Sequence, residues 1–335
     1  MIPVAVIGAS GYTGLELIGI LSRHPEFELV YLATSEGGTT LEALHPALCK
    51  VVSMPVEKAD ASAVAEVAQI AFLALPHKTA MGFAGELLER GVRVVDLSAD
   101  YRLKLETYEA HYCPHTDRAH LQEAVYGLPE FYREKIRKSR LVANPGCYPT
   151  ASLLGLLPFV PYLKPDSPIF IDAKSGVSGA GKKLSETTHF VTVNENIFAY
   201  NPIAHRHAPE IAEKIDDLFV TQAEVLFVPH LIPVTRGMLC SIYMQLENEI
   251  DPIEILNDLY AREPFVRIRT EPVRIKSVAG TNFCDIYARA NGRSLFISSA
   301  IDNLLRGASS QAVVNANILC GFDETLGIPR YAYVP

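Results

Sequence analysis

Cys147 is the residue whose type and surroundings most clearly indicate chemistry. It follows an apolar run over residues 141–143 and an Asn-Pro-Gly breaker over residues 144–146. The apolar stretch over residues 151–157 predicts a helix, which places Cys147 at or just before its N-terminus. Backbone N–H groups and the positive end of the helix dipole favour a thiolate there, and a thiolate in a fixed position is a good nucleophile. The alternative interpretation is a buried structural cysteine.

A second group of candidate catalytic side chains is the segment His-Arg-His-Ala-Pro-Glu-Ile, residues 205–211. Pro209 fits the first turn of a helix over residues 208–219. His207 and Glu210 are three residues apart, which is neighbour spacing on such a turn. A carboxylate that accepts a hydrogen bond from an imidazole fixes its tautomer and raises its basicity, so the pair predicts an acid/base. Metal binding is the competing interpretation, but His-x-His lacks a nearby third ligand, and we expect no metal.

The start of the chain has the context of a dinucleotide-binding motif. An apolar, β-branched run over residues 2–7 predicts a buried strand, and a helical apolar pattern follows a glycine turn. The glycines are spaced G-x-x-G-x-x-G, which departs from G-x-G-x-x-G. A tight turn without a ligand is the alternative. The residues of this turn that we expect to contact a dinucleotide are Gly8, Ser10, Gly11, Tyr12, Thr13 and Gly14.

The end of the second predicted strand, residues 29–33, bears on the choice of cofactor. An NAD enzyme usually has Asp or Glu there to hold the ribose 2′-hydroxyl. Here Thr34 and Ser35 follow the strand, and their hydroxyls suit a 2′-phosphate, although Glu36 comes next and no arginine lies nearby in the sequence. The pattern favours NADP, with Ser35 as a contact.

Further strands and helices alternate through the first half of the chain. Residues 69–75 and 92–97 predict buried strands with a helix over residues 79–88 between them. This alternation predicts a mostly parallel, doubly wound sheet that binds ligands at the carboxyl ends of its strands. Pro76 and Arg102 follow two of those ends. Arg102 is suited to a phosphate or carboxylate; the alternative is a surface arginine paired with Asp100 or Glu106.

The second half predicts an α+β domain with a mainly antiparallel sheet. Residues 169–173 predict a strand that leads into a glycine- and lysine-rich loop over residues 174–183, suited to an anionic ligand or else merely solvated. Residues 224–228 and 239–246 predict antiparallel strands. Residues 283–289 and 294–301 predict a hairpin around Asn-Gly. Because such a sheet needs a cover on each apolar face, we expect a partner subunit.

Composition narrows the class of protein. The chain has 335 residues, 49% of them hydrophobic and 20% charged, which is typical of a globular protein of two domains. The net charge of −8 argues against nucleic acid or an anionic membrane as a partner. There is no apolar stretch of transmembrane length and no signal peptide. Six scattered cysteines without a C-x-x-C pair favour a reducing cytoplasm.

Seven segments together closely resemble the N-acetyl-γ-glutamyl-phosphate reductases, a family related in architecture to aspartate-semialdehyde dehydrogenase. The resemblance runs in order over nearly the whole chain, and its cysteine and H-R-H-x-P-E-I segments are specific. The unusual glycine spacing fits this family's own form. The segments are residues 8–14, 144–148, 174–182, 205–211, 229–233, 236–237 and 302–303.

The resemblance implies that NADPH reduces the acyl phosphate N-acetyl-γ-glutamyl phosphate to N-acetylglutamate semialdehyde in arginine biosynthesis, with release of phosphate. Cys147 would form a thioester that then accepts hydride. A histidine of the H-R-H segment would be the acid/base. The i, i+3 spacing to Glu210 favours His207, which leaves His205 as a substrate contact. Further expected contacts are Arg102, Ser175 and Tyr200 for the substrate, and Gly179 and Asn303 for the nicotinamide half of the cofactor.

The expected organisation is a Rossmann-type domain over residues 1–146, completed by a C-terminal helix within residues 303–335, and a catalytic and oligomerisation domain over residues 147–302. A homodimer or homotetramer is expected. Two rival functions remain at this point. One is a related acyl-phosphate reductase, either aspartate-semialdehyde dehydrogenase or the reductase of the aminoadipate route. The other is an NADP-sensing regulatory protein without catalysis.

Overall fold

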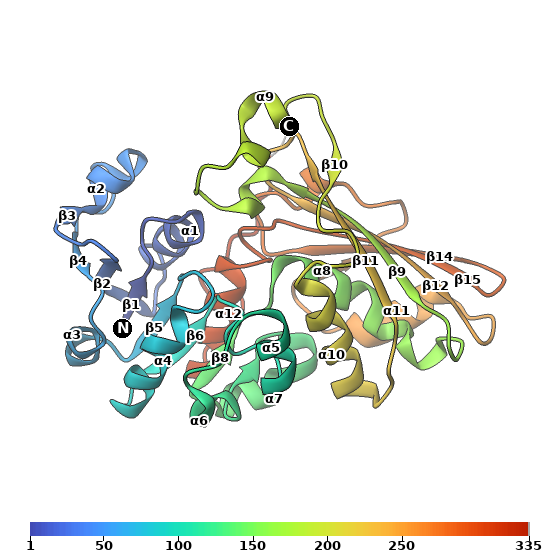
Figure 1. The fold of residues 1–335 in the computed structure, drawn as a ribbon, viewed down its shortest axis with the longest axis horizontal. Coiled ribbons are helices and arrows are strands. Elements are labelled where there is room, and N and C mark those ends of the chain that lie inside the picture. The colour runs from blue at the N-terminus through green and yellow to red at the C-terminus, as the bar shows by residue number, and fades with distance from the viewer. Residues whose placement is uncertain (334–335) are drawn as a thin grey trace. The chain divides into compact units, whose positions relative to one another are not determined.

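The computed structural model describes residues 1–333 and divides into two compact units (Figure 1). The first unit comprises Met1–Pro145 and Ala308–Pro329. The second comprises Gly146–Gly307 and the C-terminal residues from Arg330. The second unit therefore begins at Gly146, one residue before the helix that starts at Cys147.

The first unit contains an eight-stranded sheet of order β3-β4-β2-β1-β5-β6-β8-β7. Only the pairing of β3 with β4 is antiparallel; the others are parallel. The prediction of a doubly wound, mostly parallel sheet is confirmed. The strands are β1 (Ile2–Ile7), β2 (Phe27–Thr34), β3 (Thr39–Thr40), β4 (Pro55–Lys58), β5 (Ile70–Leu73), β6 (Arg93–Asp96), β7 (Val125–Tyr126) and β8 (Leu141–Ala143).

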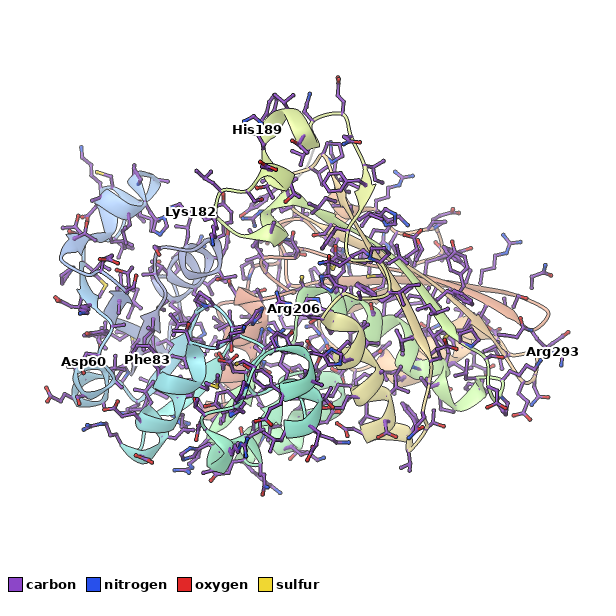
Figure 2. The ribbon with its side chains drawn as sticks, in the orientation of Figure 1. Asp60, Phe83, Lys182, His189, Arg206 and Arg293 are labelled. Carbon is purple, nitrogen blue, oxygen red and sulfur yellow. The ribbon has the colours of Figure 1, made fainter. Side chains whose placement is uncertain are left out.

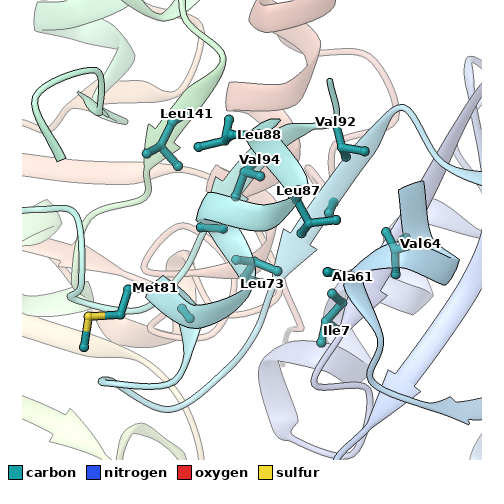
Figure 3. Packing of buried hydrophobic residues seen from close by; sticks show 14 of the residues in the cluster. Ile7, Ala61, Val64, Leu73, Met81, Leu87, Leu88, Val92, Val94 and Leu141 are labelled. Atoms are coloured by element: carbon teal, nitrogen blue, oxygen red, sulfur yellow. The ribbon is translucent and has the colours of Figure 1, made fainter. Parts of the chain in front are cut away.

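Helices follow most of these strands. They are α1 (Tyr12–Leu21), α2 (Leu41–Leu44), α3 (Ala61–Val67), α4 (Ala80–Glu89), α5 (Leu105–His111), α6 (Arg118–Leu121), α7 (Pro129–Lys138) and α12 (Ser309–Cys320). Leu87 and Leu88 of α4 pack with Leu73 of β5 and Val94 of β6 in one buried cluster (Figure 3). Burial of these side chains from water drives the helix onto the sheet.

The predicted C-terminal helix begins later than the sequence suggests. The apolar and small-residue pattern starts at Asn303, but α12 begins at Ser309. Residues 302–307 form a turn instead, because Oδ1 of Asp302 accepts hydrogen bonds from the backbone N–H groups of Leu304 and Leu305. An aspartate side chain that binds nearby backbone N–H groups favours a turn over helix.

The second unit contains a seven-stranded mixed sheet of order β10-β11-β9-β12-β15-β14-β13. The pairs β11–β9 and β13–β14 are parallel; the other four pairs are antiparallel. The predicted hairpin is confirmed, since β14 and β15 pair from Asn291 with Ser294 onward, and Arg293 lies at its tip (Figure 2). The strands are β9 (Ile169–Gly176), β10 (Phe198–Ala199), β11 (Val225–Ile232), β12 (Met238–Gln245), β13 (Val266–Ile268), β14 (Cys284–Asn291) and β15 (Ser294–Ile301).

Strands β11 and β12 are not neighbours, although consecutive strands with a short connection usually pair. Strand β9 lies between them, parallel to β11 and antiparallel to β12. Its last three residues pair with His230, Leu231 and Ile232, which extends both strands into stretches that the sequence pattern predicted as loops. Alternation of apolar and polar residues indicates that a segment is a strand, but it does not show which strand pairs with it.

Helices cover one face of this sheet. Figure 1 shows α8 (Cys147–Leu156), α10 (His207–Phe219) and α11 (Pro252–Tyr260) on the same side of the strands, and the short α9 (Phe190–Val193) lies in the segment that follows β9. The opposite face is open: Phe170 and Tyr243 are each 48% exposed, whereas Ile171, next to Phe170 in the chain, is 1% exposed. Among residues 1–333, no helix is long and apolar enough to cross a membrane.

Candidate active site

Cys147 is the first residue of α8, as the sequence pattern predicts. Gly146 is the N-cap residue, with extended backbone angles and no side-chain cap, and the Cys147 side chain is half-buried. The first backbone N–H groups of a helix and its dipole favour negative charge at this position. The geometry therefore suits a thiolate nucleophile.

Glu210 is tied to the helix that carries the cysteine. It is 1% exposed, and its Oε1 accepts a hydrogen bond of 3.0 Å from the backbone N–H of Gly146. His207 and Glu210 both lie in the first turn of α10, since the helix begins at His207. A hydrogen bond from His207 to Glu210 stays a prediction; the bond to Gly146 is a role that sequence spacing did not reveal.

The two histidines lie together but have different surroundings. Their ring centroids are 4.9 Å apart, and Nδ1 of His205 accepts a hydrogen bond of 3.2 Å from the backbone N–H of His207. Burial, with a smaller contribution from the charge of Arg206, lowers the pKa of His205 to about 4. His205 is consequently neutral near pH 7, with its proton on Nε2.

Tyr148 is a member of this cluster that the sequence analysis missed. It is 3% exposed, and its ring lies against those of His205, His207 and Phe227. Its hydroxyl is 2.9 Å from that of Tyr200, which brings Tyr200 to the site. The only signal in the sequence was its place next to Cys147 at a helix start.

The turn over residues 302–307 packs against the cysteine. A Cβ placed on Gly307 would lie 2.6 Å from Cβ of Cys147 and 2.6 Å from the carbonyl oxygen of Asn303. Asn303 is 3% exposed; its Oδ1 accepts from the backbone N–H of Gly237 at 2.7 Å, and its Nδ2 donates to the hydroxyl of Ser178. The absence of a side chain at Gly307 therefore leaves the space that Cys147 occupies.

The glycine- and lysine-rich segment differs from the expected loop. Strand β9 continues through Gly176, and Nζ of Lys174 lies 2.6 Å from a carboxylate oxygen of Asp172. Ser175 is 1% exposed and its hydroxyl donates to the carbonyl of Gly176. A Cβ on Gly179 would lie 2.9 Å from that hydroxyl oxygen and 3.6 Å from Asn303 Nδ2. The structure thus brings these three predicted contacts together.

The rest of that segment is exposed. Lys182 and His189 lie on the stretch that leads into and around α9 (Figure 2). Strand pairing separates Lys174 from the other lysines, so the prediction of three lysines in one loop is wrong.

The glycine turn of the first unit has the shape of a dinucleotide site. Gly8 has φ of +99° and a Cβ there would collide with the carbonyl of Ala74, while a Cβ on Gly14 would collide with the carbonyl of Gly8. Both positions thus require glycine. Gly11 is the N-cap residue of α1, which has no side-chain cap. The helix N-terminus therefore has backbone N–H groups suited to a pyrophosphate, and Ser10, Tyr12 and Thr13 flank it.

The region expected to hold the 2′-phosphate gains a residue from another strand. Lys58 pairs in register with Thr34, and the backbone of Gly37 turns back onto Lys58. The hydroxyl of Thr34 accepts from the N–H of Gly37 and so holds the turn, while Ser35 is exposed. Strand β4 thus places the backbone of a lysine, Lys58, beside the end of β2. Pro76, at the end of β5, is also exposed.

Arg102 is buried, and the interpretation as a surface arginine is wrong. It is 5% exposed; its Nε donates to the carbonyl of Asn144 and an Nη donates to the carbonyl of Leu97, each at 2.7 Å. These bonds join the ends of β6 and β8. The carboxylate of Asp100 instead accepts from the backbone N–H groups of Lys78 and Met81. Substrate binding by Arg102 stays a prediction.

Among residues 1–333, no group of three or more metal-ligating side chains is placed to hold a metal ion. The N-cap and first residues of α8 instead include Cys147 and contact Glu210, His205 and His207, a set that suits acid/base and nucleophilic chemistry.

Both units match models of one enzyme class. Residues 3–139 match the model described as semialdehyde dehydrogenase, NAD binding domain, and residues 147–303 match the one described as semialdehyde dehydrogenase, dimerisation domain. The fold agrees. The structure of aspartate semialdehyde dehydrogenase II from Vibrio cholerae superposes with a TM-score of 0.73 at 18% identity, covering 96% of this chain and 98% of that one. That of the Candida albicans enzyme with NADP gives 0.72 at 14%, covering 96% and 99%. The chain has the architecture of the semialdehyde dehydrogenase class.

Relatives within this class are more specific. The N-acetyl-gamma-glutamyl-phosphate reductase of a Sulfurovum species is 65% identical over 335 residues, covering 100% of both chains. That of Wolinella succinogenes is 60% identical, covering 100% of this chain and 99% of its own. The chain belongs to the N-acetyl-gamma-glutamyl-phosphate reductase family.

Proposed function

We propose that the chain catalyses the NADPH-dependent reduction of N-acetyl-γ-glutamyl phosphate to N-acetylglutamate 5-semialdehyde, with release of phosphate, in cytoplasmic arginine biosynthesis. The observation that carries the proposal is Cys147 at the first position of α8, followed by Tyr148, whose ring lies against the imidazoles of His205 and His207. The full-length identity to reductases of this name supports the choice of substrate.

The thiolate of Cys147 attacks the acyl carbon, a C–S bond forms, and the C–O bond to phosphate breaks with its electron pair leaving on phosphate. When bound, the reduced nicotinamide would supply a hydride to the thioester carbon. Collapse of the resulting oxyanion would then give the aldehyde, with the C–S bond breaking and its electron pair returning to the thiolate of Cys147. The N–H groups at the start of α8 stabilise the thiolate in both steps.

His207 is the proposed acid/base, oriented by Glu210. His205 is poorly suited to this role, because its Nδ1 already accepts the backbone N–H of His207 and its pKa is lowered to about 4. An efficient acid/base has a pKa near the working pH. His205, Tyr200, Ser175 and Arg102 are the proposed substrate contacts.

The proposed cofactor is NADP. The uncapped N-terminus of α1 suits its pyrophosphate, and Gly179 and Asn303 are proposed to approach its nicotinamide half. The hydroxyl of Ser35 and the ammonium of Lys58 suit a 2′-phosphate, since charge-assisted hydrogen bonds to phosphate are strong.

A second copy of this chain is the proposed partner, in a homodimer or homotetramer. The open face of the mixed sheet has a hollow of about 630 Å³ lined largely by apolar and aromatic side chains, among them Phe170, Tyr243, Tyr287 and Phe296. An exposed apolar face of this kind marks an interaction surface, and the matching family model is described as a dimerisation domain.

The test is the Cys147→Ser variant, assayed for both reduction and cofactor affinity. We expect reduction to fall by more than about a thousandfold, because serine is a far weaker nucleophile at neutral pH, with NADPH affinity within about twofold. Turnover of the variant near that of the unmodified chain would contradict the role of Cys147, whereas NADPH binding without turnover in the unmodified chain would indicate a cofactor-sensing protein. Comparing the acyl phosphates of N-acetylglutamate, aspartate and N-acetylaminoadipate as substrates tests the choice of substrate.

A further inference from the structure

Tyr148 contacts several of the proposed site residues. It is the second residue of α8, directly after Cys147, and only 3% of it is exposed. A tyrosine at the start of a helix would normally place its hydroxyl in water. Here the whole side chain is enclosed by residues from three other elements or loops.

The ring of Tyr148 lies edge-on against both imidazoles. Its centroid is 5.6 Å from that of His205, with planes at 79°, and 5.8 Å from that of His207, with planes at 65°. Phe227 of β11 supports it at 5.2 Å. Edge-to-face geometry at these separations is the preferred arrangement of aromatic pairs. Each imidazole is therefore held at a defined angle to a side chain on the helix that carries the nucleophile.

The hydroxyl of Tyr148 makes a second set of contacts. It is 2.9 Å from the hydroxyl of Tyr200 and donates to the backbone carbonyl of His230 at 3.4 Å. The ring of Tyr200 in turn lies 5.5 Å from that of His205. Burial is the main cause that raises the pKa of both tyrosines. Both hydroxyls therefore stay protonated at any pH at which the protein works.

We infer that Tyr148 is a positioning residue of this site: its ring orients the imidazoles of His205 and His207 relative to the helix turn that carries Cys147, and its hydroxyl orients Tyr200. The inference rests on the proposed reductase activity. Because Tyr148 follows Cys147 in the chain, any movement of the helix start moves the nucleophile and the imidazole support together. Cys147 and the imidazoles of His205 and His207 then keep their relative positions when the helix start moves.

The test compares Tyr148→Phe and Tyr148→Leu with Tyr260→Phe as a matched control. Tyr260, on α11, is 4% exposed and donates its hydroxyl to the carbonyl of Leu154 at 2.7 Å. The control therefore removes a similarly buried hydroxyl that binds the other end of α8. We expect Tyr148→Phe to lower kcat/KM for the acyl phosphate about tenfold, because Tyr200, a proposed substrate contact, loses the hydroxyl that orients it. Tyr260→Phe should keep the kcat/KM of the unmodified chain.

Tyr148→Leu removes the ring that contacts the imidazoles. We therefore expect it to shift the limb of the pH–rate profile that reports titration of the catalytic imidazole. Tyr148→Phe keeps the ring and should leave that limb in place. A Tyr148→Phe variant with unchanged kcat/KM, or an equal loss in Tyr260→Phe, would overturn the inference. So would an unmoved limb in a folded Tyr148→Leu variant. Absence of turnover in the unmodified chain would instead count against the proposed reductase activity.

A double-mutant cycle tests the pairing of the hydroxyls and does not depend on the leucine variant. If the hydroxyls of Tyr148 and Tyr200 act as a unit, Tyr148→Phe combined with Tyr200→Phe loses no more activity than either alone. Multiplicative losses would show that the two hydroxyls act independently and would overturn that part of the inference.

Discussion

At the scale of single residues, the space around the thiol of Cys147 depends on the lack of a side chain at Gly307. A Cβ on Gly307 would lie 2.6 Å from Cβ of Cys147 and from the carbonyl of Asn303, so that one of them must move. We expect Gly307→Ala to lower kcat at least about tenfold, because a shift of the nucleophile of about an ångström is costly. Steady-state kinetics with Gly82→Ala as control provide the measurement. Gly82, on α4, has open space where its Cβ would be, so its activity should not change.

A second consequence at this scale concerns acid stability. The pKa of His205 is lowered to about 4 from its ordinary 6.5, chiefly by burial. Below pH 6.5 the unfolded chain binds a proton that the folded chain does not, so the free energy of unfolding falls as the pH drops from 6.5 to 4. We expect a loss on the order of 2 kcal/mol and a smaller loss in His205→Asn. Denaturant titrations at both ends of this range measure it; equal losses in the two proteins would refute the assignment.

The sequence identified the candidate site residues unevenly, for physical reasons. The position of Cys147 at a helix start was predicted correctly because a breaker between a strand and a helix is a local pattern. Tyr148 was missed because its partners come from segments 50 or more residues away. Glu210 was found by helical spacing, yet its bond to Gly146 spans 64 residues. Local spacing identifies candidate side chains, and only tertiary packing shows which atoms they meet.

At the scale of elements, strand order decides what lies beside a loop. The strand, turn and helix of residues 2–21 follow from local pattern, and β1 and α1 match it (Figure 1). The pairing of β4 with β2, and of β9 between β11 and β12, depends on contacts between distant segments. Lys58 reaches the end of β2 through that pairing, which explains why the sequence near Ser35 shows no basic residue.

The position of Lys58 predicts its part in cofactor choice. We expect Lys58→Ala to raise KM for NADPH about tenfold and to leave KM for NADH nearly unchanged, since only NADPH has the phosphate that the ammonium would bind. Lys138→Ala is the control, because Lys138 is an exposed lysine at the end of α7. If both cofactors were affected equally, the lysine would act on the fold of the turn and not on the phosphate.

At the scale of the whole molecule, the mixed sheet has one face without a helix layer. Buried and exposed side chains alternate along β9, with Ile169 and Ile171 at 0% and 1% exposure and Phe170 at 48%. Helices α8, α10 and α11 lie on one side of the strands, as Figure 1 shows. A sheet in water keeps aromatic residues on an uncovered face chiefly when another surface covers it. The second unit thus has the proposed catalytic residues on its helical side, and its open face, which includes Phe170 and Tyr243, is the proposed assembly surface.

If the open face that includes Phe170 and Tyr243 is the assembly surface, a negative charge placed on it should weaken the association of subunits. Phe170→Glu should shift the chain from an oligomer toward the monomer at micromolar concentration, because burying an unpaired carboxylate at an interface costs several kcal/mol. Sedimentation velocity measures the shift. Val67→Glu is the control: Val67 is 46% exposed on α3 of the other unit, so its substitution should leave the sedimentation coefficient unchanged. An oligomer unaffected by Phe170→Glu would show that copies of the chain associate through some other surface, and the open face would then need a different explanation.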